Sequence, residues 1–482
     1  MEESNLKLKV LSNLFWRFLE RGGTQGIQFI IQILLARLLV PNDYGTVSLI
    51  TIFISIANVF VQSGFSTALI QKKDADEIDF SSVLYLSIFV ASLIYVALFF
   101  SAPFIASFYG ISELIAVLRV LAVTLFFGAF NSIQNAMVAK KMQFKKLFFS
   151  SSLASLISGV VGVILAYSGF GVWALVAQQL TNQIMVTIVL WFTVKWRPKI
   201  IFSFEKVKEL FSFGWKLLVA DLINTFYSNL RSLIIGKLYN PAMLGLYNRG
   251  DQFPNIIVTN IDGSIQSVML PALSAEQNNK TRVRTMMRRS IVTSAFIVFP
   301  MMMGLAVIAE PLVKLLLTEK WLQCVPFLQI ACAYYALYPI HTANLQAINA
   351  LGRSDIFLKL EITKKIIGIV ILAISIKFGV YAIAVGSLIT GMISSFINAF
   401  PNVKLLDYSY KEQIRDVIPS LILSLLMGVI IYNFRWLEMG VWLTVIVQIC
   451  MGGIIYIFLS KFFKLECYTY LVSTIMGLLK KN

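Results

Sequence analysis

The chain alternates long apolar segments with short connections, and the polar residues inside the apolar segments follow helical spacing. The first segment places polar side chains at steps of three or four, at Arg17, Arg21, Gln25, Gln28 and Gln32. Residues with this spacing lie on one face of a helix. Residues 44–71 carry no charge and repeat the spacing at Ser55, Asn58, Gln62 and Ser66. The pattern predicts a pair of membrane helices, each with one polar face.

The proline and glycine residues between these two helices recur further along the chain. Pro41 and Gly45 correspond to Pro241 and Gly245 at a constant offset of 200 residues. Polar positions meet polar positions at the same offset, as in Arg21 with Asp221 and Gln62 with Asp262. Repeats of this kind are common in transporters. They predict two six-helix lobes related by pseudo-two-fold symmetry.

Composition places these segments in a membrane. Hydrophobic residues make up 58% of the 482 and charged residues only 13%, and many uncharged runs exceed the roughly 20 residues that span a bilayer. We expect an all-α polytopic membrane protein with about fourteen transmembrane helices, because a helix pairs its own backbone groups in lipid. The expected spans are residues 14–40, 44–70, 80–108, 113–138, 147–167, 171–194, 210–238, 241–268, 289–318, 321–350, 355–377, 379–402, 416–434 and 438–461.

The spans group into four predicted parts. Residues 1–194 form an N-terminal six-helix lobe, and residues 195–209 form a basic cytoplasmic linker that contains Pro198. Residues 210–402 form a C-terminal six-helix lobe, and residues 403–482 add two helices and an amphipathic cytoplasmic tail. Six spans is an even number, so both lobes begin on the same side of the membrane.

Charge predicts the orientation. The net charge is +17, and most of the cations fall in one set of connections, which by the positive-inside rule is cytoplasmic. Both termini are then cytoplasmic. The basic face would lie against anionic lipid headgroups. It does not require a nucleic-acid partner, because the sequence offers no basic soluble domain.

Charged residues within the spans are the candidates for function, because each costs about 2.5–3.5 kcal/mol at a helix centre. One interpretation is a water-filled cavity between the lobes whose cations bind an anionic group. The other is that these side chains snorkel to the interface or pair internally. The substrate-binding candidates are Arg21, Gln25, Gln28, Asn58, Gln62, Arg231, Arg249, Gln252 and Asn255. The candidates for a coupling-ion site are Asp221 and Asp262.

Catalytic chemistry is not indicated. The sequence contains no nucleophile elbow, no phosphate-binding glycine loop and no zinc-ligand spacing. Its four cysteines form no CxxC pair, and its one histidine, His341, lies in an apolar segment. We therefore expect no enzyme activity, no bound metal and no cofactor.

Three strings resemble one family of transporters. They are FLERGGTQGIQFIIQILLARLLVPNDYGTVSL, FVQSGFSTALIQKKDADEIDFSSVLY and GLYNRGDQFP. They look like the Wzx-type polysaccharide exporters, in the branch of lipopolysaccharide, colanic acid or teichuronic acid biosynthesis proteins. The resemblance covers nearly the whole chain and is strongest over the first ~150 residues. Arg21 and Arg249 lie inside these strings.

The resemblance implies the multidrug/oligosaccharidyl-lipid/polysaccharide exporter fold and alternating access through a central cavity. It also implies a flippase that moves an undecaprenyl-diphosphate-linked oligosaccharide from the inner to the outer leaflet of the bacterial cytoplasmic membrane, for lipopolysaccharide or exopolysaccharide. Its partners would be this substrate, membrane lipids and further polysaccharide assembly proteins. The alternative is a cation-coupled multidrug extruder on the same fold. A cavity for cations would favour acidic residues, whereas these spans mix Arg with Asp.

Overall fold

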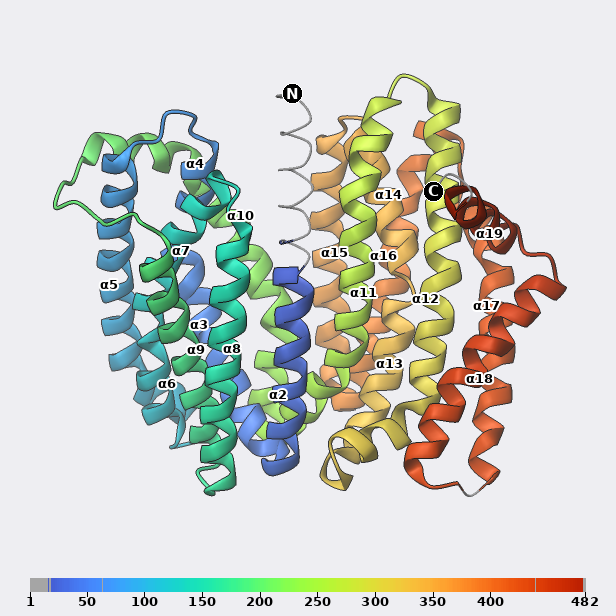
Figure 1. The fold of residues 1–482 in the computed structure, drawn as a ribbon, viewed down its shortest axis with the longest axis horizontal. Helices are drawn as coiled ribbons and strands as arrows, with labels where there is room; N and C mark the ends of the chain where they lie inside the picture. The colour runs from blue at the N-terminus through green and yellow to red at the C-terminus, as the bar shows by residue number, and fades with distance from the viewer. Residues whose placement is uncertain (1–15, 17–18, 63, 438, 480–482) are drawn as a thin grey trace. The chain divides into compact units, whose positions relative to one another are not determined.

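The computed structural model describes residues 16, 19–62, 64–437 and 439–479, and this part of the chain is helical (Figure 1). The chain divides into two compact units, unit 1 at Met1–Gly245 and unit 2 at Leu246–Asn482. The all-helical, polytopic expectation is confirmed.

Helix ends follow local sequence signals. Asp76 begins α5 (Glu77–Tyr109) by accepting from the backbone N–H groups of Ile78 and Asp79, in a capping box. Gly110 ends α5 in the left-handed region at φ 70°. Gly64, at φ 82°, separates α3 (Pro41–Gln62) from α4 (Phe65–Gln71). This second predicted span is therefore a broken helix.

Unit 1 is built from the first part of the chain. Its helices are a π-helical turn η1 (Leu19–Gly23), α2 (Thr24–Leu38), α3, α4, α5, α6 (Leu114–Ala122), α7 (Thr124–Lys140), α8 (Phe144–Tyr167), α9 (Val172–Thr193) and α10 (Phe204–Leu238). One of its core clusters is aliphatic, with Leu35, Leu118 and Leu125 fully buried, and a second cluster adds the aromatic residues Phe65, Phe80 and Trp196. Aromatic residues of α5 point outward, as at Phe100, Phe104 and Phe108. An apolar outer surface is what lipid requires.

Unit 2 holds the remaining helices. They are α11 (Pro241–Ala275), whose first turn belongs to unit 1, α12 (Lys280–Leu316), a 3-10 helix η2 (Glu319–Cys324), α13 (Val325–Tyr335), α14 (Tyr338–Ala350), α15 (Ser354–Ser375), η3 (Ile376–Phe378), α16 (Val380–Leu406), α17 (Tyr410–Asn433), η4 (Phe434–Leu437), α18 (Val441–Phe462) and α19 (Glu466–Leu479). Helix α12 is the centre of the unit and packs against α13, α14, α17 and α18.

Helical segments lie at all fourteen predicted spans, several of them interrupted. In the described part of the chain, ten helices are long and apolar enough to cross a membrane. That the other four segments also cross, namely α2, α10, α13 with α14, and α15, stays a prediction. The division into lobes at 1–194 and 210–402 also stays a prediction, and the structure packs α10 within unit 1.

Candidate functional site

The polar face of α2 lies within unit 1. Gln25 and Gln28 are exposed, and Gln28 donates to the Ser155 hydroxyl of α8 at 3.4 Å. One turn earlier, Thr24 and Ser152 join the same two helices through their hydroxyls at 3.4 Å. The side chain of Arg21 lies outside the described residues. The predicted stripe on this helix is therefore a hydroxyl and amide seam against α8.

The polar face of α3 is half-buried against a glycine. Gln62 donates to the side chain of Asn58 at 2.8 Å. A Cβ atom at Gly128 of α7 would lie 2.8 Å from the ends of both side chains, so the amide pair lies directly against this glycine. The structure thus brings Asn58 and Gln62 together, as their spacing predicts.

Helix α9 supplies polar groups that sequence reasoning missed. Asn131 of α7 donates to Gln183 at 3.1 Å and accepts from Thr187 at 2.9 Å. Asn182 donates to Ser158 of α8 at 3.2 Å. The available signal was the run of amides at residues 178–183. Because these amides are uncharged, a search for charged residues within apolar segments does not detect them.

The predicted polar residues of α10 are accessible. Asp221 is exposed and Arg231 is half-buried. Both lie in the central part of the helix, between residues 215 and 234, where no side chain is buried. The accessible carboxylate on α10 therefore differs from the candidate carboxylate on α11.

Arg249 of α11 is enclosed within unit 2. Its side chain is only 5% exposed and donates to Gln252 at 2.6 Å. The guanidinium lies 5.2 Å from the centre of the Trp321 ring, and Trp321 is itself fully buried. A cation over an indole face is a favourable contact. The sequence around Arg249 does not predict this contact, because Trp321 lies far along the chain, on η2.

Two carboxylates on α11 face α13 and α14. Asp251 accepts from Asn255 and from the Tyr335 hydroxyl, both at 3.3 Å. Asp262 accepts from the Thr342 hydroxyl and from Gln266 at 2.7 Å. These contacts form a polar ladder inside unit 2, continued by Gln346 donating to Gln266 at 3.3 Å. The printed partners of Asp262, Thr342 and Gln266, are both uncharged.

Metal and thiol chemistry are not indicated by the geometry. Within the described residues, no group of three or more His, Cys, Asp or Glu side chains could hold a metal ion. Cys324, Cys332 and Cys467 are free and buried, as apolar fillers would be. His341 is bonded to Asn398 through Nδ1 at 3.0 Å.

Several known proteins are similar to this chain in sequence. Residues 34–326 match the family described as polysaccharide biosynthesis protein. The teichuronic acid biosynthesis protein TuaB of Bacillus subtilis (strain 168) is 28% identical over 302 residues, 62% of each chain. The succinoglycan biosynthesis transport protein ExoT of Rhizobium meliloti (strain 1021) is 23% identical over 65% of its length. The chain thus spans less than two thirds of these two relatives. The lipopolysaccharide biosynthesis protein WzxC of Escherichia coli (strain K12) is 21% identical over 89% of each chain.

Solved structures give the fold. The lipid II flippase MurJ, in an inward closed conformation, superposes with a TM-score of 0.75 at 16% identity, over 96% of this chain and all of MurJ. An inward-facing multidrug transporter of the MATE family reaches 0.59 at 16% identity, over 79% of this chain and 94% of that one. The family match covers more than half of the chain, and the MurJ superposition covers nearly all of it. This multi-pass membrane protein therefore belongs to the polysaccharide biosynthesis protein family and has a MurJ-like fold.

Proposed function

We propose that the protein is a transporter, not an enzyme, that flips an undecaprenyl-diphosphate-linked oligosaccharide from the inner to the outer leaflet by alternating access. The observation that carries the proposal is the pairing of a polysaccharide biosynthesis family match with a fold shared with a lipid II flippase. A cytoplasmic membrane location follows from this role. Both termini would be cytoplasmic, because the basic connections favour that side.

The amides of unit 1 are suited to the saccharide. Gln25, Gln28, Asn58 and Gln62 are exposed or half-buried, and each both donates and accepts hydrogen bonds. Sugar hydroxyls have the same double capacity. We add Gln183 of α9 to this set, because its bond to Asn131 places it on the same kind of neutral seam.

The arginines are suited to the diphosphate, since a guanidinium fork binds phosphate oxygens in pairs. Arg231 on α10 is half-buried and is therefore more accessible than Arg249. Arg249 with Gln252 and Asn255, and Arg21 of the first motif, complete the set. Because Arg249 is enclosed, it would reach a ligand only after its contact with Gln252 opens. The competing role for Arg249 is to stabilise α11 against Trp321.

Asp262 and Asp221 are the candidate coupling groups. Asp262 is supported by its burial and by its bonds to two uncharged side chains. Binding of a proton or a cation would therefore not have to displace either of these partners' charges, since they carry none. Asp221 is supported by its accessibility on α10. Other polysaccharide assembly proteins are candidate partners for delivery and removal of the substrate.

The multidrug extruder is the less supported alternative. Its structural match is weaker, with a TM-score of 0.59 against 0.75. The family match is to polysaccharide biosynthesis proteins over residues 34–326.

Depletion of the protein followed by lipid analysis tests the proposal. We expect a diphosphate-linked oligosaccharide to accumulate in the inner leaflet, and purified protein in liposomes to flip that same lipid. An Arg231→Ala variant should flip more slowly than its Arg231→Lys counterpart. Depletion that changes only drug sensitivity, with no saccharide intermediate, would support the extruder instead.

A further inference from the structure

Helices α5 and α12 each contain a proline close to their C-terminal end. Pro103 lies in α5 and Pro311 in α12, 208 residues apart in the sequence. Proline has no backbone N–H, so the carbonyl of the residue four positions earlier in the helix has no donor of its own. The carbonyls affected here are those of Phe99 and Val307. A backbone carbonyl in an apolar environment needs another donor, which neighbouring helices can supply.

In unit 1 the carbonyl of Phe99 accepts a hydrogen bond from an arginine. The Nε atom of Arg119, on α6, donates to it at 3.2 Å. The Cζ atom of the same guanidinium lies 4.0 Å from the centre of the Phe99 ring, which is a favourable distance for a cation over an aromatic face. Arg119 therefore contacts both the freed carbonyl and the side chain of Phe99.

In unit 2 the carbonyl of Val307 is bonded in the same way, by an arginine from another kind of element. The Nη2 atom of Arg435, on η4, donates to it at 3.0 Å. The guanidinium also lies 4.8 Å from the centre of the Tyr432 ring. Val307 is only 7% exposed, so water has little access to its backbone. The arginine is therefore the available donor for this carbonyl.

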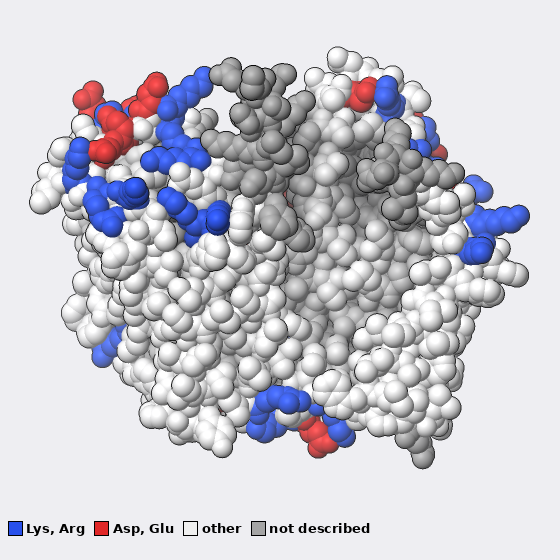
Figure 2. Space-filling view, viewed as in Figure 1, with Lys and Arg blue, Asp and Glu red and all other residues white. Residues whose placement is uncertain are grey.

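Arg119 lies apart from the main group of charges in unit 1. The charged residues of this unit gather where α4 meets α5 and at the start of α10, above a broad uncharged surface (Figure 2). Helix α6, which carries Arg119, follows the opposite end of α5. Within the described part of the chain, no acidic side chain forms an ion pair with Arg119, and its hydrogen bond goes to Phe99. A surface ion pair therefore does not account for this arginine.

Arg435 has a second charged contact, which competes as an explanation. It pairs with Glu310 of α12 at 3.0 Å. Glu310 is 58% exposed, and accessible ion pairs contribute little to stability. A hydrogen bond from a charged donor to a carbonyl that has no other donor contributes more. The bond to the carbonyl is also the contact that Arg435 shares with Arg119.

The two arginines do not correspond to each other in the sequence, although the two prolines have the same spacing as the carbonyls they affect. The residue 208 positions after Arg119 is Phe327, and Arg435 lies beyond the twelfth predicted span. Two unrelated positions thus supply the same type of donor to the same type of carbonyl. A shared physical requirement explains this agreement better than sequence repetition does.

We infer that Arg119 and Arg435 are replacement donors: each supplies to its neighbouring helix the hydrogen bond that Pro103 or Pro311 removes, and thereby fixes the last turns of α5 or α12. Their charge serves the backbone of the scaffold. They are therefore separate from Arg231 and Arg249, the arginines proposed for the diphosphate.

A double-mutant cycle in the full-length protein tests each donor, with the midpoint of thermal unfolding as the readout. Arg119→Leu removes the bond and the ring contact and should lower the midpoint by about 3 °C or more. Pro103→Ala returns a backbone N–H to the carbonyl of Phe99. In the Pro103→Ala background, Arg119→Leu should therefore lower the midpoint by about half as much or less. The ring contact is lost in both backgrounds and cancels.

Exchanging the prolines provides the matched control. Pro311→Ala leaves the carbonyl of Phe99 without a backbone donor, so it should not reduce the loss caused by Arg119→Leu. For Arg435→Leu we expect the reverse, with a smaller loss in the Pro311→Ala background and an unchanged loss in the Pro103→Ala background. Glu310→Gln, which removes only the ion pair, should lower the midpoint less than Arg435→Leu does.

Equal losses in the two proline backgrounds would overturn the inference. If Arg119→Leu yields no folded protein, adding Pro103→Ala should restore a monodisperse protein and adding Pro311→Ala should not. Failure of Pro103→Ala to restore it would overturn the inference as well. Because stability and not transport is measured, either result leaves the proposed flipping untouched.

Discussion

Helices α10 and α17 each come directly after six predicted spans, but their buried residues are distributed differently. Each contacts the third of those spans, α5 in unit 1 and α12 in unit 2. One face of helix α17 is buried along nearly its whole length, at Gln413, Val417, Ser420, Leu423, Ser424, Met427, Gly428 and Ile431. Helix α10 has enclosed residues only near its ends.

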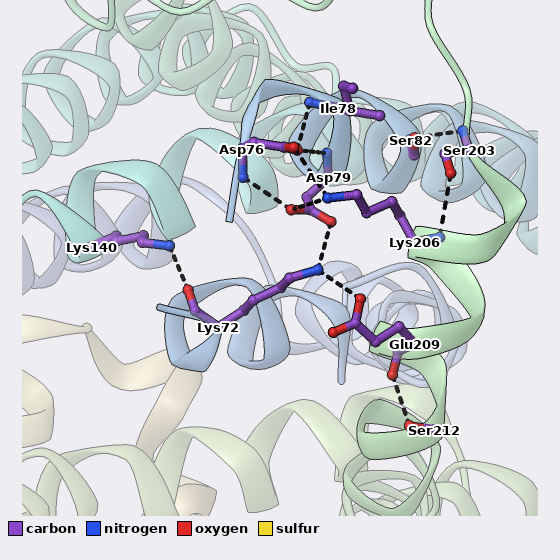
Figure 3. A network of polar contacts seen from close by, with 10 residues as sticks. All are labelled: Lys72, Asp76, Ile78, Asp79, Ser82, Lys140, Ser203, Lys206, Glu209 and Ser212. Carbon is purple, nitrogen blue, oxygen red and sulfur yellow. Dashed lines mark hydrogen bonds and ion pairs between the residues drawn. The ribbon is translucent and has the colours of Figure 1, made fainter. Parts of the chain in front are cut away.

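The ion pairs near the start of α10 and of α17 differ in which partner helix carries the acidic residue and which carries the basic one. In unit 1 the acids Asp76 and Asp79 precede or begin α5, and Lys206 comes from α10 (Figure 3). In unit 2 the base Arg288 lies on α12, and it binds Asp416 of α17 through two bonds of 2.9 and 3.1 Å. Ion pairs thus mark the start of both helices, and buried residues continue further along α17 than along α10.

The largest expected effect comes from the close contact of Gly45 with Pro241, which lies just after the end of α10. Gly45→Leu makes a side chain collide with the carbonyl of Pro241. It should lower the free energy of unfolding by at least about 3 kcal/mol. We expect little monodisperse protein and a much lower midpoint of thermal unfolding. Gly26→Ala, on an exposed helical position with no atom within 4 Å, is the matched control and should not lose stability. Normal stability of the Gly45→Leu variant would show that the Gly45–Pro241 contact is not tightly packed.

A smaller effect is expected at the start of α17. Arg288→Gln removes the paired bonds to Asp416 and the contact with Glu466 at 3.1 Å. Because Arg288 is 41% exposed, the loss should be about 1 kcal/mol. The thermal midpoint should fall by a few degrees. Lys411→Gln, at an exposed position of α17, should leave the midpoint unchanged. An unchanged midpoint in the Arg288→Gln variant would show that these pairs add nothing to the packing of α17.

Salt should affect the two helices differently, without any mutation. The Debye length falls from about 10 Å at 0.1 M to about 3 Å at 1 M, so accessible pairs weaken over this range. Glu209 of α10, which pairs with Lys72 at 2.7 Å, is 61% exposed, whereas Asp416 of α17 is 18% exposed. We expect salt to speed up hydrogen exchange of the backbone amides more in the first turns of α10 than in the first turns of α17. Glu209→Gln, which lacks this pair, should respond less, and an equal response would contradict an electrostatic contribution at the start of α10.

Near-neutral pH should have the smallest effect. The backbone N–H of Asp79 and the Lys206 side chain lower the pKa of Asp76 from 3.8 to about 2, so the stabilisation from Asp76 is present above about pH 4 and is lost only as pH falls through about 2. Burial alone would lower the pKa of Lys72, but its bonds to Glu209 and Asp79 raise it above 10.5. The difference in thermal midpoint between the parent protein and Asp76→Asn should therefore stay constant between about pH 5.5 and 8.5. A change within that range would implicate a further titrating group.

The sequence predicted the helices better than their contacts, and the internal repeat stays a prediction. Polar spacing located α2 and α3 because this signal is local, and the shared Pro and Gly residues suggested the repeat. That Gly45 and Gly245 meet each other's proline carbonyls depends on how distant helices pack. The same holds for Arg249, which the sequence offered as a substrate-binding residue and which the structure buries beside Trp321 of η2.

The ion pairs at the start of α10 were hidden among ordinary signals. Lys72 and Lys206 lie in the basic connections that the sequence predicts to be cytoplasmic, and the positive-inside rule explains such cations without any specific partner. Only the folded chain brings Glu209 and Asp79 to Lys72. The amides around Gln183 were missed for a different reason, since neutral side chains in an apolar run carry little cost.

Flipping by the purified protein tests the central claim most directly. The lipid-linked saccharide that accumulates on depletion is placed in liposomes with the purified protein, and its movement between the leaflets is followed. We predict that the protein moves this lipid faster than it moves in protein-free liposomes, and that Arg231→Ala slows the movement. Movement no faster than in protein-free liposomes would contradict the proposed function.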